Sequence, residues 1–139
     1  MWRDGKRIDD AIARCPRTAA LLERVPKVDI PETGPTVFFS ILAPKAHIPA
    51  HMGVTNTRLI VHVPLVIPPG CRFRVGSETR EWEFGKAFVF DDTIEHEAWN
   101  DSDVPRAVLI FDIWNPYLTL AERDLVRAAV AGVQEYNRS

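Results

Sequence analysis

Histidine is scarce in this sequence, and the histidines are the side chains best suited to bind a metal ion. There are four of them: His47, His51, His62 and His96. His51 lies in a segment that reads as a turn between two strands, and His96 lies in a loop after the apolar run that ends at Phe90. Imidazoles at the ends of separate strands can meet on one metal ion, and imidazole suits iron, zinc, copper or nickel. Their spacing alone leaves two interpretations, a shared metal site at His51 and His96 or solvated surface histidines.

Carboxylates crowd around His96, and they are Asp91, Asp92, Glu95 and Glu97. In a surface loop such residues are simply solvated charges. Beside a metal ion, one of them can instead orient a bound water or hold a ligand in place. Asp92 is the candidate for this role, because it follows the strand that ends at Phe90 and precedes His96 by four residues.

Arg106 opens the most apolar stretch of the chain. If Val108, Ile110 and Asp112 share its side of a strand, its guanidinium points into largely hydrophobic surroundings. A buried guanidinium requires a carboxylate, because an unpaired buried charge is costly. That carboxylate is either a protein side chain or the acid group of a ligand, held through two parallel hydrogen bonds. His62, inside another apolar stretch, is similarly either a core histidine or a ligand contact.

The elements that must position these residues begin with helices. Apolar residues recur at three- and four-residue spacing between Ile8 and Leu22, and Pro16 divides them into two short helices. Residues 25–35 are rich in proline and read as a loop. Near the end of the chain, Thr119 is a suitable N-cap for a further helix that continues through Val133.

Between these ends the apolar pattern changes to a period of two, with many β-branched and aromatic residues. It predicts strands at residues 36–42, 58–67, 71–75, 79–84, 86–90 and 107–114. Short strands at close spacing predict an antiparallel sandwich or barrel. We therefore expect one mainly β domain over residues 1–139, with N- and C-terminal helices. A jelly roll (a cupin-like double-stranded β-helix) is the commonest fold of this kind that encloses a metal site.

Composition excludes several classes of protein. The 139 residues are 46% hydrophobic and 26% charged, which is typical of a soluble domain with one core. A net charge of −2 argues against a nucleic-acid-binding protein. No apolar run approaches the roughly 20 residues of a spanning helix, and the first residues lack the core of a signal peptide. We expect a cytoplasmic protein without nucleic-acid or membrane partners, in which Cys15 and Cys71 are reduced thiols without a role.

The order of these residues resembles that of the aspartyl/asparaginyl β-hydroxylase family. The most specific segment is Phe90-Asp91-Asp92-Thr93-Ile94-Glu95-His96-Glu97-Ala98-Trp99, which follows the family pattern Phe-Asp-Asp-Thr/Ser-x-x-His-Glu-x-Trp. Further similar segments are residues 39–44, 47–53 with Asn56, Gly85, Arg106 and 112–116, and residues 5–23 resemble the helices that precede the family's barrel. The resemblance covers nearly the whole chain, although longer relatives have a segment before its first residue.

This resemblance implies a double-stranded β-helix and an oxygenase that uses iron(II), 2-oxoglutarate and dioxygen. His51 and His96 would be the iron ligands. Arg106 would pair with the distal carboxylate of 2-oxoglutarate, and Ser40 and His62 would contact the same cosubstrate.

Two further positions follow from the resemblance. Most oxygenases of the wider superfamily add a carboxylate to two histidines, whereas this family lacks it. Gly53 stands at the position of that carboxylate, and a water held by Asp92 would fill the vacant ligand site. The sequence also departs from the family at Ile60, where an arginine on the cosubstrate side is common. Arg58 has the same strand parity and is the candidate to compensate for it.

The implied reaction is hydroxylation of an unactivated C–H bond, in an Asp or Asn residue of a peptide or in a small amino-acid-like molecule. Two alternatives stay open. One is a cupin-like enzyme that does not use 2-oxoglutarate and therefore needs no buried arginine. The other is a non-catalytic or degenerate module that only binds metal or 2-oxoglutarate.

Overall fold

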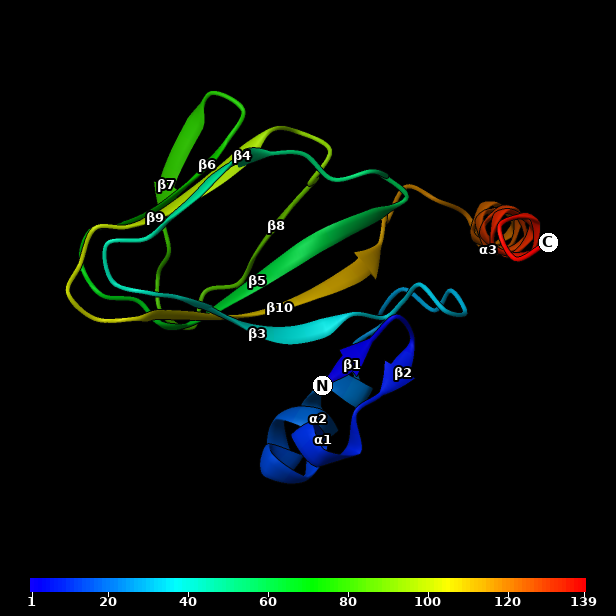
Figure 1. Ribbon diagram of the computed structural model, residues 1–139, viewed down its shortest axis with the longest axis horizontal. Coiled ribbons are helices and arrows are strands. Elements are labelled where there is room, and N and C mark those ends of the chain that lie inside the picture. The colour runs from blue at the N-terminus through cyan, green and yellow to red at the C-terminus, as the bar shows by residue number, and fades with distance from the viewer.

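The computed structural model describes residues 1–139, and its strands form two antiparallel sheets that face each other (Figure 1). The large sheet has the strand order β2-β1-β3-β10-β5-β8 and the small sheet the order β4-β9-β6-β7. The large sheet comprises β1 (Trp2–Arg3), β2 (Lys6–Arg7), β3 (Val37–Leu42), β5 (Arg58–Val66), β8 (Phe88–Phe90) and β10 (Arg106–Trp114). The small sheet comprises β4 (His47–His51), β6 (Cys71–Val75), β7 (Glu78–Glu81) and β9 (His96–Asn100).

The outer face of the large sheet packs against two short helices, α1 (Asp9–Arg14) and α2 (Pro16–Glu23) (Figure 1). Pro16 occupies the first turn of α2, where its missing N–H leaves no hydrogen bond unmade. Ile12 and Leu22 from these helices join Leu109 and Phe111 of β10 in one buried cluster. Alternate residues of β10, including Arg106, therefore face the small sheet.

A second buried cluster lies between the two sheets and includes Leu42, Phe73, Ala98 and Val108. The β3–β4 and β9–β10 connections pass from one sheet to the other at the same end of the molecule (Figure 1). Leu42 ends β3 opposite Arg106 in the register of β3 and β10, so Arg106 lies at this closed end.

Helix α3 (Leu120–Tyr136) begins at Thr119, whose side chain and that of Glu122 form a reciprocal capping box. Val126 and Val130 pack it against Trp114, at the end of β10 remote from Arg106 (Figure 1). No helix combines the length and the apolar character needed to cross a membrane.

The expected mainly β fold with terminal helices is confirmed. Two local predictions are wrong. The segments around His51 and His96, predicted to be a turn and a loop, are strands β4 and β9 and pair with each other. The predicted strand 79–84 is β7 and ends at Glu81. The missed strands contain a proline or several charges, so they lack the alternating apolar pattern and are held by pairing with neighbours.

Candidate active site

A cavity of about 550 Å³ lies between the two sheets. Its walls come from the inner faces of β3, β5 and β10 on one side and of β4, β6 and β9 on the other. All of the side chains that were assigned a role from the sequence line this one cavity: Ser40, His51, Arg58, His62, Asp92, His96 and Arg106. His47 and the other carboxylates near His96, which are Asp91, Glu95 and Glu97, do not line it. The fold therefore gathers residues that are remote in the chain.

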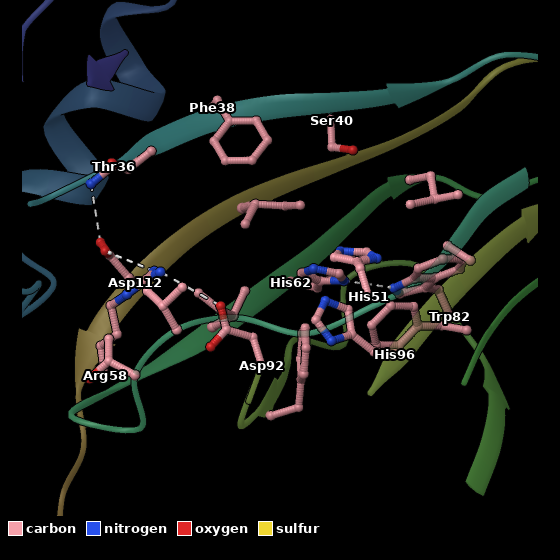
Figure 2. A pocket seen from close by; sticks show the side chains of 18 of the residues that line it. Thr36, Phe38, Ser40, His51, Arg58, His62, Trp82, Asp92, His96 and Asp112 are labelled. Carbon is pink, nitrogen blue, oxygen red and sulfur yellow. Dashed lines mark hydrogen bonds and ion pairs between the residues drawn. The ribbon is translucent and has the colours of Figure 1, made fainter. Parts of the chain in front are cut away.

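His51 and His96 face each other across the β4–β9 ladder, as register partners with ring centroids 4.1 Å apart (Figure 2). A register shift between Ile48 and His51 marks a bulge in β4, and bulges re-aim side chains near functional sites. The Nδ1 atom of His51 lies 2.8 Å from the carbonyl oxygen of Pro49, and that of His96 lies 2.9 Å from that of Ile94.

These two hydrogen bonds determine which ring nitrogen of each histidine is available to bind a metal ion. A carbonyl oxygen only accepts, so Nδ1 of each neutral ring must carry the proton and donate it. The Nε2 atoms of His51 and His96 are then unprotonated, which is the state that binds a metal ion. The pair fits a divalent metal such as iron(II), with both tautomers already set by the backbone.

Asp92 lies beside this pair and has an unused acceptor. Its side chain is buried, and its Oδ1 atom has no hydrogen-bond partner in the protein. A Cβ atom added to Gly53 would lie 2.3 Å from the Asp92 carboxyl carbon, so the Asp92 carboxylate fills the space that a side chain at position 53 would need. No cluster of three metal-binding side chains is present. The site thus offers two protein ligands and a neighbouring carboxylate, rather than a triad.

Arg58 lies near Asp92 and not near Arg106. Its Nη1 atom is 3.3 Å from Oδ2 of Asp112, and its Nη2 atom is 3.6 Å from Oδ2 of Asp92 (Figure 2). Asp112 also accepts a hydrogen bond from the backbone N–H of Thr36 at 3.1 Å. Burial raises the pKa of Asp112 above its ordinary value. The structure therefore gives no support to Arg58 compensating at the cosubstrate end for the arginine replaced by Ile60.

This region is the accessible end of the cavity. Asp4 and Val54, which also line the cavity, are exposed, and Val54 has 93% of its surface accessible. Asp4 belongs to the turn between β1 and β2, next to the start of β3, and Val54 lies shortly before Arg58. A large ligand can therefore enter beside Arg58 and Asp112, and His51 is itself exposed.

Arg106 lies at the opposite, closed end and is only 1% exposed. Its Nη1 atom donates to the carbonyl oxygen and to Oγ of Ser40, both at 3.3 Å. Its Nε atom has no partner, and no protein carboxylate forms an ion pair with it. Burial lowers the pKa of this guanidinium. Of the two interpretations of Arg106, the structure favours a ligand carboxylate.

His62 lies on β5 between these two ends and is buried. Burial lowers its pKa to about 3, with further lowering by the charges of Arg106 and His96. The ring is therefore neutral near pH 7. The indole N–H of Trp82 donates to its Nδ1 atom at 3.3 Å (Figure 2), so the proton of the neutral ring resides on Nε2. His62 can thus donate a hydrogen bond into the cavity, whereas His51 and His96 present lone pairs.

Trp82 and Asp112 were not predicted as site residues. Trp82 falls within the predicted strand 79–84, but the observed β7 ends at Glu81, so the pattern does not fix the direction of its side chain and nothing in the sequence signals its role. Asp112 could have been predicted as a site residue, because it shares strand parity with Arg106 and therefore faces the same side of the sheet.

The close approach at Gly53 leads to a testable prediction. We expect Gly53→Ala to destabilise the fold by about 1–3 kcal/mol, because Asp92 is buried and must move to admit the methyl group. Urea denaturation measures the change. Gly132→Ala is the matched control, because a Cβ atom there meets nothing within 4 Å and alanine favours the α3 helix. Equal stability of Gly53→Ala and the wild type would contradict the packing described.

The chain is similar in sequence to known hydroxylases. The sequence model described as aspartyl/asparaginyl beta-hydroxylase matches residues 1–116. The human aspartyl/asparaginyl beta-hydroxylase is 41% identical over 124 residues, which cover 88% of this chain and 16% of that protein. The ornithine lipid ester-linked acyl 2-hydroxylase of Rhizobium tropici is 38% identical over 115 residues, 81% of this chain and 39% of that protein. The chain thus spans well under half the length of these relatives.

A solved structure supports the fold alone. A cupin protein from Bacteroides fragilis superposes with a TM-score of 0.51 at 18% identity, covering 63% of this chain and 71% of that one. Helix α3 lies beyond the last residue of the family match.

Proposed function

Because the chain belongs to the aspartyl/asparaginyl β-hydroxylase family, we propose that it is an iron(II)- and 2-oxoglutarate-dependent oxygenase that hydroxylates an unactivated C–H bond. One observation carries the proposal. Two imidazoles with unprotonated Nε2 atoms and one buried guanidinium without a carboxylate partner line the same cavity. The two imidazoles suit a divalent metal ion, and the guanidinium suits the far carboxylate of a dicarboxylic acid.

In this proposal His51 and His96 hold the iron ion. The backbone carbonyls of Pro49 and Ile94 keep both rings oriented, so that little rearrangement accompanies metal binding. With the metal bound, the free Oδ1 atom of Asp92 would accept a hydrogen bond from a water molecule beside it. Arg58 holds the other oxygen of Asp92 and stops the carboxylate from turning toward bulk solvent.

Arg106 and Ser40 bind the distal carboxylate of 2-oxoglutarate at the closed end, where water is excluded and the ion pair is strong. His62 donates its Nε2–H to the same cosubstrate. Iron(II) and 2-oxoglutarate, when bound, supply the oxidation by dioxygen that yields succinate, carbon dioxide and the hydroxylated substrate. The chain's part is to orient both and to keep the closed end dry.

The substrate in this proposal enters at the Arg58–Asp112 end. Candidates are an Asp or Asn residue of a peptide and a small amino-acid-like molecule, because Arg58 and Asp112 offer both a hydrogen-bond donor and acceptors there. The names of the relatives include an aspartyl/asparaginyl hydroxylase and a lipid acyl hydroxylase, so the family accommodates more than one class of substrate.

The test is succinate release from purified protein with iron(II), 2-oxoglutarate and ascorbate, in the presence of a panel of amino acids and Asp- or Asn-containing peptides. We expect one member of the panel to accelerate succinate release and to gain one oxygen atom by mass spectrometry. A thermal shift with 2-oxoglutarate measures binding separately, because a ligand of the native state raises its stability. Absence of both binding and succinate release would refute the proposal.

A further inference from the structure

Trp82 lies in the segment that returns the chain from β7 in the small sheet to β8 in the large sheet. It is 4% exposed and lines the cavity at its closed end. Its ring packs among Phe73 and Phe88, with centroids 5.4 Å and 6.4 Å away, so part of its role is to fill the space between the sheets. Two polar contacts distinguish it from an ordinary core tryptophan.

The first contact is the hydrogen bond from the indole N–H to Nδ1 of His62 (Figure 2). Without a donor at Nδ1, a neutral imidazole can carry its proton on either nitrogen. The Nδ1–H form would turn the lone pair of Nε2 toward the cavity and repel a carboxylate. Trp82 therefore selects the tautomer of His62 that can bind an anion.

The second contact is with Arg106, whose guanidinium carbon lies 4.8 Å from the centroid of the Trp82 ring. Apart from the two bonds to Ser40, the guanidinium has no hydrogen bond within the protein. An aromatic face stabilises a cation without consuming its N–H donors. Trp82 thus supports Arg106 and leaves its remaining donors for a ligand.

We propose that Trp82 is a positioning residue for a carboxylate ligand: its N–H sets the tautomer of His62, and its ring face holds the guanidinium of Arg106. The identity of the ligand as 2-oxoglutarate rests on the proposed function.

The experiment compares Trp82→Phe with the wild type, because phenylalanine keeps a six-membered aromatic face for Arg106 and removes the N–H donor together with the five-membered ring that carries it. Trp99→Phe is the matched control. Trp99 contacts the guanidinium of Arg72 at the same 4.8 Å but does not line the cavity. Circular dichroism and melting curves check that all variants are folded.

The first readout is the ¹⁵N spectrum of the histidine rings in metal-free protein near pH 7.5, with His62 assigned through His62→Gln. We expect the Nε2–H tautomer of His62 in the wild type and in Trp99→Phe, and a mixture of both tautomers in Trp82→Phe. A residue that only fills space would not change the tautomer.

The second readout is the affinity for 2-oxoglutarate in anaerobic iron(II) protein, measured by calorimetry. We expect Trp82→Phe to bind about 3–10-fold more weakly. Trp82→Leu, which also removes the ring face, should lose about a further 3–10-fold. Iron affinity should not change in either variant.

An unchanged tautomer together with unchanged 2-oxoglutarate affinity in Trp82→Phe would overturn the inference. The proposed function fails separately. If the tautomer changes in Trp82→Phe but the wild type binds no 2-oxoglutarate, the link between Trp82 and His62 is supported and the cosubstrate assignment is wrong.

Discussion

Substitution of His96 by alanine should abolish iron binding and cosubstrate turnover together. In the proposed function only His51 and His96 hold the metal, so the variant would retain one of the two proposed ligands, His51. Loss of a supporting outer residue typically costs 10–100-fold in metal affinity, and loss of a direct ligand should exceed about 100-fold. Metal analysis after dialysis and succinate release measure the two effects.

His47→Ala is the matched control for this substitution. His47 also lies on β4, but its side chain is outside the cavity, 3.0 Å from Glu97 and stacked on Trp99. We expect this variant to bind iron and turn over as the wild type does. A His96→Ala protein with one tightly bound iron ion and normal turnover would show that the metal site is elsewhere or absent.

The parts of the fold that could be predicted from sequence are those where burial imposes a period. The segment containing Val108 and Leu109 is apolar on both faces because α1 and α2 cover one side and the small sheet the other. β4 is exposed along most of its length, so HIPAH carries no such period. β9 does alternate between buried and half-buried residues, but its buried positions are His96, Ala98 and Asn100, so HEAWN shows no apolar alternation. Their pairing depends on long-range contacts that a local pattern does not encode.

The candidate site likewise has residues that could be predicted from the sequence and one whose position could not. Residue types and the family pattern were sufficient to suggest His51, His96, Asp92 and Arg106, because their chemistry is unusual for their surroundings. The position of Arg58 could not be predicted this way. Strand parity gave its face correctly, but only the β5–β10 register shows that it pairs with Trp114, eight residues from Arg106. Strand parity predicts which face of the sheet a side chain lies on, whereas the register between strands determines which end of the cavity it lies at.

The second large effect is expected from Arg106→Met, which should bind iron normally and lose 2-oxoglutarate. Methionine has a similar length and fills the same space, so the cavity should keep its shape. Truncating one partner of a buried charge pair costs several kcal/mol, which corresponds to a loss of about 100-fold or more in affinity. Calorimetry with anaerobic iron(II) protein gives this value, and a cupin-like enzyme independent of 2-oxoglutarate would keep its activity.

Arg72→Met is the control for this variant. Arg72 also contacts a tryptophan ring and forms an ion pair with Asp101, but it is half-exposed and outside the cavity. Its loss should leave the binding of 2-oxoglutarate unchanged. Equal affinity in Arg106→Met and Arg72→Met would contradict the role assigned to the buried guanidinium.

The same substitution should raise the stability of the ligand-free protein, which separates a binding role from a structural one. Arg106 is a buried cation with no carboxylate partner and an unpaired Nε atom, so in the absence of ligand it costs free energy. Methionine removes that cost, and we expect about 1–2 kcal/mol of added stability, or a few degrees in Tm. A structural arginine would give the opposite sign. Addition of 2-oxoglutarate should then raise the Tm of the wild type, because a ligand that pairs with the guanidinium stabilises the native state. The Tm of Arg106→Met should stay unchanged.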